Sequence, residues 1–371
     1  MDTSSGKNKN KTTSWALQGG DRDDGSQRPV RIVVVTGSSG MVGHHVVREL
    51  QDHQGVQEVR LFDVRPFENT LGHPMRKRTK QVLGSVCDAQ AVREAVRGAD
   101  AVIHCAALVP AAVIEDEAAL ERVNVQGTQN VVDACLEENV AYLVHTGSVV
   151  VIMDKQLSES KWCYESPYSE TKARAEKIIE EARKRSFRNG LHSLRTIVVR
   201  LPPIYGELDR LVVAGLIRWS KRMCNILFRM GPGFQCIYAG NAAAAHIRAL
   251  DALSEDSTLS GRCLVACDDT PTDFGAFLGP LIEGHRIRIL PLPLPYVLMM
   301  AVAVSTRGIA TLLAPFIPSV REAQLLKPSD VRFAYGGATF DDADFRKALE
   351  WQPKYSPQEA ARLARLFYDE L

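Results

Sequence analysis

The sequence lacks an excess of either charge, and it lacks the paired cysteines of a thiolate metal site. Its 45 Lys and Arg residues balance 44 Asp and Glu residues, for a formal net charge of +1 at pH 7. Such a chain has no basic field to attract a polyanion, so nucleic acid is not expected as a partner. No C-x-x-C pair occurs among the eight cysteines. Neither His104 nor His246 has a partner at metal-ligand spacing, so we expect core or strand-end roles for both. We therefore expect that the chain binds no metal. We also expect its cysteines to be buried free thiols in a reducing compartment.

Two longer-range signals are also missing. Residues 1–30 are rich in Ser, Lys, Asn, Gly and Asp without the apolar core of a signal peptide, so we interpret them as a disordered leader. No repeat with a period of about 20 to 50 residues is visible, which argues against a solenoid. A length of 371 residues then favours one large domain with a smaller appended lobe.

From Arg31 onward, short β-branched runs alternate with helical stretches, which is typical of a parallel sheet covered on both faces. The predicted strands are Arg31–Thr36, Glu58–Phe62, Gln81–Leu83, Ala101–His104, Ala141–Thr146 and Leu194–Leu201. The predicted helices are Met41–Asp52, Ala89–Arg97, Leu120–Glu138, Pro167–Arg185 and Pro357–Tyr368. We expect an α/β Rossmann fold with a doubly wound sheet over 31–203, and a smaller substrate lobe over 204–371.

A glycine-rich turn follows the first predicted strand, where RIVVVTGSSGMVG spans 31–43. The first glycine permits a tight turn, the second lets the backbone approach a pyrophosphate, and the third lets the helix pack on the strand, with the helix N-terminus facing the anion. The predicted cofactor contacts in this turn are Gly37, Ser39, Gly40, Met41, Val42 and Gly43.

Asp63 ends the second predicted strand, 20 residues after Gly43. A carboxylate at this place accepts both hydroxyls of an adenosine ribose, which favours NAD as the cofactor. NADP remains the alternative, because Arg65 could partly offset the repulsion between Asp63 and a 2′-phosphate.

Tyr168 and Lys172 are four residues apart in the predicted helix Pro167–Arg185, so they share one helix face. A phenol is a poor base at neutral pH, but an adjacent ammonium and a positive nicotinamide ring favour its phenolate. Ser148 lies just after a predicted strand, 20 residues before Tyr168, where its hydroxyl can orient a substrate oxygen. We predict these three residues to be catalytic.

In their order, these motifs resemble the extended short-chain dehydrogenase/reductase superfamily from Arg31 to the C-terminus. The matching segments are Thr36–Gly43 (T-G-x-x-G-x-x-G), His104–Ala107 (H-x-A-A) and Asn124–Thr128 (N-x-x-G-T). The resemblance implies that Ala106 and Ala107 lie beside the cofactor. Within the superfamily, the segments Ile204–Glu207, Tyr238–Asn241 with His246, and Asp268–Pro271 are most similar to the 3β-hydroxysteroid dehydrogenase/Δ5-4 isomerase family.

This resemblance implies NAD-dependent oxidation of a steroid or sterol 3β-hydroxyl to a ketone, with isomerisation left open, and a homodimer as a family expectation. Two alternatives stand beside it. One is the related sterol-4α-carboxylate 3-dehydrogenase, which releases carbon dioxide. The other belongs to a different class: a dinucleotide-sensing regulator that binds the cofactor and does no chemistry, although such proteins typically lack the Tyr/Lys pair.

The segment 290–317 is almost wholly apolar, with Arg307 as its single charge. A charge near the centre of a membrane span costs about 2.5–3.5 kcal/mol on insertion scales, and prolines shorten the segment further. Three interpretations stay open: an interfacial helical pair on a membrane surface, a soluble segment covering an apolar pocket, and a true span. The resemblance favours association with the endoplasmic reticulum or a mitochondrial membrane; otherwise the chain is cytoplasmic.

Overall fold

The centre of the molecule is a parallel sheet of seven strands in the order β10-β6-β5-β4-β1-β2-β3. The computed structural model describes residues 28–152, 166–187, 193–229, 231, 233, 235–291, 294–320, 323–337 and 339–371. The strands of the sheet are β1 (Ile32–Thr36), β2 (Glu58–Asp63), β3 (Arg78–Leu83), β4 (Ala101–His104), β5 (Tyr142–Ser148), β6 (Arg195–Leu201) and β10 (Arg262–Val265). The central strands β1, β4 and β5 are mostly apolar and almost wholly buried, because helices cover both faces.

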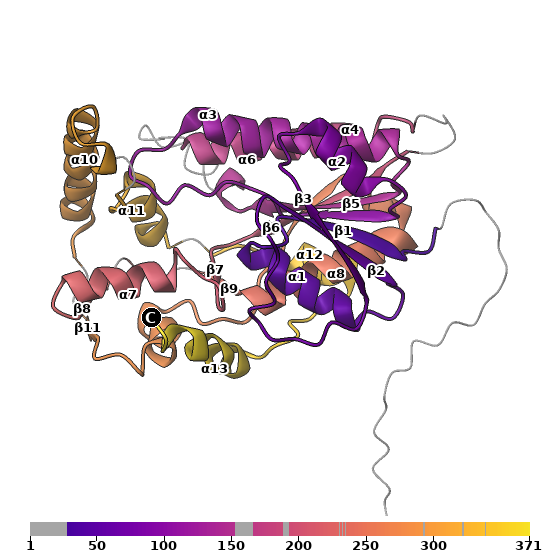
Figure 1. Ribbon diagram of the computed structural model, residues 1–371. Helices are drawn as coiled ribbons and strands as arrows, with labels where there is room; N and C mark the ends of the chain where they lie inside the picture. Colours follow the sequence, from indigo (N-terminus) through magenta and orange to yellow (C-terminus); the bar gives the residue numbers. More distant parts are fainter. Residues whose placement is uncertain are drawn as a thin grey trace, which may run out of the picture.

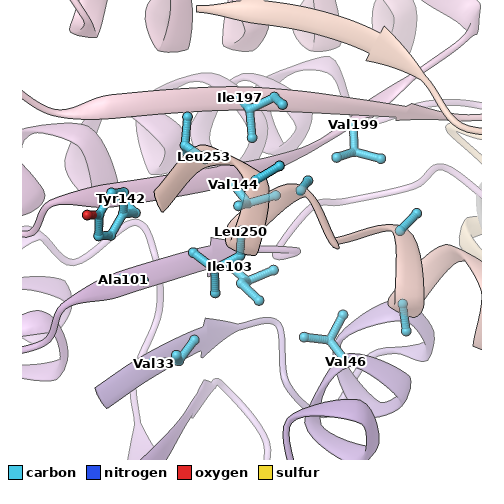
Figure 2. Packing of buried hydrophobic residues seen from close by; sticks show 14 of the residues in the cluster. Val33, Val46, Ala101, Ile103, Tyr142, Val144, Ile197, Val199, Leu250 and Leu253 are labelled. Atoms are coloured by element: carbon cyan, nitrogen blue, oxygen red, sulfur yellow. The ribbon is translucent and has the colours of Figure 1, made fainter. Parts of the chain in front are cut away.

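Each face of the sheet carries its own layer of helices (Figure 1). The helices of one face are α1 (Met41–Asp52), α8 (Ala239–Glu255) and α12 (Ala343–Leu349). The helices of the other face are α2 (Ala89–Val96), α4 (Gly127–Glu137) and α6 (Pro167–Ala182). Figure 2 shows the first core, in which Val46 of α1 and Leu250 of α8 face Ile103 and Val144 of the sheet.

A smaller lobe is built from the remaining elements. Its helices are α7 (Val213–Arg222), α9 (Phe274–Leu278), α10 (Tyr296–Leu313), α11 (Pro328–Tyr335) and α13 (Pro357–Tyr368). Its strands form two short parallel pairs, β7 (Ile204–Tyr205) with β9 (Ile237–Tyr238), and β8 (Ile226–Phe228) with β11 (Arg288–Leu290). Residues of α7, α9 and α13 share a separate apolar core. Figure 1 places α7, α10 and α11 together at one end of the molecule.

The predicted fold class is confirmed, but the division at 203 does not describe the sheet. Its outer strand β10 (Arg262–Val265) pairs with β6 and comes from the range expected to form the lobe. The six predicted strands all exist, although β3 begins at Arg78 rather than Gln81. The sequence analysis did not predict the seventh strand, β10, because its neighbour in the sheet, β6, ends about 60 residues earlier in the chain.

Two predicted segments differ from the structure. The helix expected over Leu120–Glu138 is interrupted by a π-helical turn, Glu121–Gln126, preceded by the short helix α3 (Glu117–Leu120). Nearer the C-terminus, the described residues of the apolar segment 290–317 contain one α-helix, α10, rather than a helical pair. The prolines that suggested a break precede α10, with Pro295 as its N-cap residue, or follow it.

The leader was predicted to extend to residue 30, but residues 28–30 lie against the sheet. The Arg28 backbone N–H donates to the Tyr142 hydroxyl at 3.2 Å, and Val30 packs on the core. The rest of the leader, residues 1–27, lies outside the described residues. All seven cysteines in the described part of the chain are free, as expected, but Cys87 and Cys224 are exposed rather than buried.

Candidate active site

The glycine turn after β1 has the geometry that its sequence predicts. Gly37 has a φ of 69°, and a Cβ on it would lie 2.7 Å from the backbone of Ala106. A Cβ on Gly43 would lie 2.1 Å from the Gly37 carbonyl oxygen. The first position therefore requires glycine for its conformation and for close approach to β4, and the last for the packing of α1 on the turn.

The N-terminus of α1 is open to a ligand. Its N-cap residue is Gly40, which has no side chain to cap the free backbone N–H groups, and the first turn, which contains Met41 and Val42, has no acidic residue. The Ser38 hydroxyl is buried there without a hydrogen-bond partner in the described structure. Unpaired N–H groups and a positive helix end bind anions, so this turn can hold a pyrophosphate.

Asp63, at the end of β2, lies beside this turn. One carboxylate oxygen accepts from the Ser39 backbone N–H at 3.0 Å, and the other from the Arg65 backbone N–H at 3.0 Å. Each oxygen keeps a further lone pair for a ribose hydroxyl. The Arg65 guanidinium donates to the Ser39 carbonyl at 3.2 Å, so it also borders the turn.

A buried chain of hydrogen bonds fixes the end of β4 next to the turn. Thr128 donates its hydroxyl proton to the Asn124 carbonyl at 2.7 Å, so its oxygen accepts from Nε2 of His104 at 3.1 Å. Nδ1 of His104 then accepts from the Thr36 hydroxyl at 2.7 Å. His104 is thus a neutral core histidine, as predicted, and burial lowers its pKa to about 3.

Ala106 and Ala107 follow β4 at the same edge of the sheet. The Ala106 backbone N–H donates to the Thr36 hydroxyl at 3.3 Å, which holds it against the glycine turn, and Ala107 is exposed. The structure therefore brings together every predicted cofactor contact of 37–43, 63 and 106–107.

The π-helical turn connects this edge to α6. The Asn124 amide oxygen accepts from the Leu108 N–H at 2.7 Å, and its amide nitrogen donates to the Leu108 carbonyl at 3.0 Å and to the Thr171 hydroxyl at 3.2 Å. π-helical turns are frequent at functional sites. The asparagine was singled out in the N-x-x-G-T match, but this bridge to α6 was not predicted.

Ser148 and Tyr168 meet at the carboxyl end of β5. Ser148 is the last residue of β5, and Tyr168 lies in the first turn of α6, which begins with Ser166 as N-cap and Pro167 at its first position. Burial raises the pKa of Tyr168 to about 12, while the nearby Ser148 hydroxyl lowers it.

Lys172 is buried one turn after Tyr168 on α6. Its ammonium donates to the Thr146 carbonyl oxygen at 2.7 Å. Burial lowers the pKa of Lys172 to about 8, and the Glu176 carboxylate opposes this by raising it. The expected effect of Lys172 on the Tyr168 pKa stays a prediction, since among the described groups Ser148 is what lowers that pKa.

Glu176 and Arg200 form a buried ion pair that the sequence analysis did not predict. The guanidinium donates to one Glu176 oxygen at 2.8 and 3.0 Å, and the other oxygen has no hydrogen-bond partner among the described residues. A Cβ on Gly147 would lie 2.7 Å from that second oxygen, so the carboxylate is pressed against β5. The available sequence signal was the position of Glu176 four residues after Lys172, which places the two side chains on one face of the helix.

His246 completes the surroundings of Lys172 from α8. Its Nδ1–H donates to the Ala242 carbonyl at 2.7 Å, so its Nε2 accepts from the Thr146 hydroxyl at 2.8 Å. Burial lowers its pKa to about 4. This is the structural role predicted for the residue, and no group of side chains suited to a metal occurs among the described residues.

The glycine turn after β1, together with the Tyr168 and Lys172 pair on α6, places the chain among the short-chain dehydrogenase/reductases. More narrowly, residues 34–293 match the 3-beta hydroxysteroid dehydrogenase/isomerase family, and the chain belongs to that family. The predictions of the family, the fold class and an oxidoreductase are thereby confirmed.

Similar proteins cover nearly the whole chain. It is 31% identical to human 3 beta-hydroxysteroid dehydrogenase type 7 over 91% of its length and 95% of that protein. It is 30% identical to the 3beta-hydroxysteroid-dehydrogenase/decarboxylase isoform 1 of Arabidopsis thaliana, over 90% of its length and 78% of that protein. A short-chain dehydrogenase/reductase superfamily protein from Agrobacterium tumefaciens, solved with bound NAD, has a TM-score of 0.63 at 20% identity, with 92% of this chain and 98% of that one covered. At 20% identity, the similarity to the Agrobacterium protein supports the fold alone.

Proposed function

We propose that the chain oxidises the 3β-hydroxyl of a steroid or sterol to the 3-ketone, with NAD as the cofactor. The observation that carries the proposal is the placement of Ser148 at the end of β5 near Tyr168 in the first turn of α6, one helical turn from Lys172, whose ammonium is bound to the same strand. Two neighbouring hydroxyls can both bind one substrate oxygen. The family and the name of the human relative supply the substrate class.

The residues at the glycine turn fit a dinucleotide. The uncapped start of α1 and the unpartnered Ser38 hydroxyl suit a pyrophosphate, and Asp63 suits an unmodified adenosine ribose, which favours NAD over NADP. Bound NAD supplies the hydride acceptor. The protein holds it through the contacts predicted at 37–43, 63 and 106–107.

The chain's own part of the reaction is proton transfer. Tyr168 takes the proton of the substrate hydroxyl, and Ser148 hydrogen-bonds the same oxygen. Because burial raises the pKa of Tyr168 to about 12, nearby positive charge must stabilise its phenolate. Lys172 supplies that charge: its ammonium has three donors, of which Thr146 occupies one. The others are available for the Tyr168 oxygen and a ribose hydroxyl.

The test is to incubate the purified chain with NAD and a panel of 3β-hydroxysteroids and to follow the nicotinamide absorbance. We expect turnover by the native chain, and a loss of about 10²–10⁴-fold in Tyr168→Phe, the contribution of a positioned acid–base group. NAD affinity of the variant, measured by calorimetry, should be nearly unchanged. NAD binding without turnover of any substrate would instead support the dinucleotide-sensing regulator, and substantial activity of Tyr168→Phe would refute the assigned role.

A second candidate is oxidation coupled to loss of a 4α-carboxylate. The similarity to the Arabidopsis dehydrogenase/decarboxylase favours it. A sterol carrying a 4α-carboxylate separates the two: carbon dioxide released in step with reduced nicotinamide supports the decarboxylating enzyme, whereas turnover of 3β-hydroxysteroids alone supports the first proposal.

We also propose that α10 associates with a membrane surface. It is the one described helix long and apolar enough to cross a membrane, with a mean hydropathy of 1.6 and 17% of its residues buried. It packs on α11 through Met299 and Ala303, Ala310 is also buried, and most of its other residues are exposed. Such a helix can lie in the interface and receive a substrate that partitions into lipid. Location on the endoplasmic reticulum or mitochondrial membrane stays a prediction.

A further inference from the structure

The exposed side of α10 is too apolar to be left to water. Val297 and Leu312 are 76% and 74% exposed, and Phe316, just beyond the helix, is 82% exposed. Contiguous apolar surface of this kind marks a site of contact with a membrane or another protein. The structure around α10 indicates which of these two it contacts.

Three arginines gather beside the segment that follows α10. Arg210, Arg218 and Arg222 line a hollow of about 590 Å³ together with Ala323 and Gln324. Arg218 and Arg222 are four residues apart on α7 and therefore share one helix face. Arg218 donates to the Arg210 carbonyl oxygen and to the Gln324 amide oxygen at 3.4 Å, which ties the cluster to the chain leaving α10.

These arginines are not neutralised within the described residues. None of the three forms an ion pair there; Arg218 is half-buried, and Arg210 and Arg222 are exposed. The nearest acidic residue in sequence, Asp209, uses its buried carboxylate to accept four backbone N–H groups of 211–214 and the Tyr368 hydroxyl. Among the described residues, the hollow therefore carries positive charge with no acidic side chain paired to it.

Exposed apolar residues are next to the lining residues of the hollow in the sequence. Leu211 adjoins Arg210, Met223 adjoins Arg222, and Leu325 adjoins Gln324; they are 40%, 42% and 37% exposed. Arginine with exposed leucine and methionine is the composition of a surface that meets an interface between headgroups and acyl chains. Figure 1 places α7 and α10 at the same end of the molecule, away from β3.

We propose that Arg210, Arg218 and Arg222 form a binding site for the phosphate of anionic phospholipid headgroups, and that this site holds α10 in the membrane interface. A guanidinium binds phosphate through two parallel hydrogen bonds, and a hollow of this volume admits a headgroup. This inference rests on the membrane association proposed above and adds to it a preference for anionic lipid.

The experiment is co-sedimentation of the full chain with phosphatidylcholine vesicles, with or without phosphatidylserine. The variant carries Arg210→Gln, Arg218→Gln and Arg222→Gln. A matched control carries Lys80→Gln, Lys347→Gln and Arg362→Gln, three exposed basic residues on β3, α12 and α13. Both variants lose the same charge, so net charge cannot explain a difference between them.

We expect the arginine variant to bind vesicles containing phosphatidylserine roughly 100-fold more weakly than the native chain. This follows from about 1 kcal/mol for each basic residue near an anionic surface, and a factor of ten for each ~1.4 kcal/mol. Its binding to pure phosphatidylcholine, whose headgroup has no net charge because choline balances the phosphate, should change much less. The control should retain most of its affinity for both vesicles, and added salt should weaken the native preference for phosphatidylserine.

A fourth protein, Leu312→Asp, reports on α10 itself. It changes a residue that is 74% exposed, so it should fold normally by circular dichroism and bind both vesicles more weakly. Equal binding of the arginine variant and the native chain to phosphatidylserine vesicles overturns the headgroup site and leaves membrane association standing. Failure of the native chain to bind any vesicle overturns both, while the dehydrogenase assay still decides the catalytic proposal. A dimer that dissociates in Leu312→Asp, with no vesicle binding, would make the surface a contact between copies and overturn the proposal.

Discussion

Lys172 is an ammonium buried among neutral neighbours. His104 of β4, His145 of β5 and His246 of α8 all have pKa values lowered by burial, so they are uncharged at neutral pH. Burial also raises the pKa of the Cys105 thiol to about 12. Among the described groups that act on Lys172, Glu176 is the carboxylate that stabilises its charge, and Glu176 is shared with Arg200.

The pH dependence of cofactor binding should therefore report on Lys172. The pKa of Lys172 is lowered to about 8, so its ammonium is present below that pH and lost above it. If Lys172 binds the nicotinamide ribose, NAD affinity should fall roughly 10- to 100-fold as the pH rises through 8, the range for a hydrogen bond from a charged donor. Glu176→Gln removes the charge that raises this pKa, so the fall should begin at a lower pH. Calorimetric titrations from pH 6 to 10 measure both curves.

Glu180→Gln is the control for this variant, since Glu180 is an exposed residue of the same helix. Its curve should coincide with that of the native chain. Superimposable curves for the native chain and Glu176→Gln would show that Glu176 does not act on Lys172 and would leave it a purely structural partner of Arg200.

The glycine turn and α1 act as one element. A methyl group on Gly43 would lie 2.1 Å from the Gly37 carbonyl oxygen, so Gly43→Ala must move the helix away from the turn. We expect a loss of about 1–3 kcal/mol in unfolding free energy, the usual cost of overpacking, and NAD binding weakened at least about tenfold. Urea unfolding and calorimetry measure the two effects.

Gly215→Ala is a matched control for that substitution. Gly215 lies inside α7, and a Cβ on it would meet no atom within 4 Å. This variant should gain about 0.4–1 kcal/mol in stability and keep its NAD affinity. A Gly43→Ala protein that behaves in the same way would contradict the close packing of α1 on the turn.

The sequence allowed elements with local end signals to be predicted closely. The helices Met41–Asp52 and Pro357–Tyr368 have the predicted bounds, because a glycine turn and a Ser-Pro pair mark their starts. The meeting of Ser148 with Tyr168 was also predictable, since both follow from the order of strands and helices. The Glu176–Arg200 pair joins α6 to β6, and its geometry depends on the folded sheet. The π-helical turn has no known sequence signal of comparable strength.

At the scale of the whole molecule, the chain returns to the sheet after building part of the lobe. β10 pairs with β6, and α8 covers the face that α1 also covers. The large apolar residues that 204–371 contributes to this core are Ile237, Leu250, Leu253, Leu259, Leu264, Phe345, Leu349 and Trp351. Burial of each such side chain contributes about 1.5–3 kcal/mol to the free energy of unfolding. The loss of all eight would therefore match or exceed the ~5–15 kcal/mol stability of a typical domain.

A fragment ending at residue 203 should therefore not fold, although it contains every residue predicted to bind NAD or to react. We expect the narrowly dispersed amide resonances of an unfolded chain by NMR, and no NAD binding by calorimetry. The full chain should unfold in urea as one unit, because the core on the α1 face of the sheet depends on segments beyond 203. Far-ultraviolet circular dichroism reports the helices and sheet, and fluorescence reports Trp219 on α7 and Trp351 after α12. Coincident transitions would show a single cooperative unit, whereas a folded fragment that binds NAD would establish 31–203 as an independent domain.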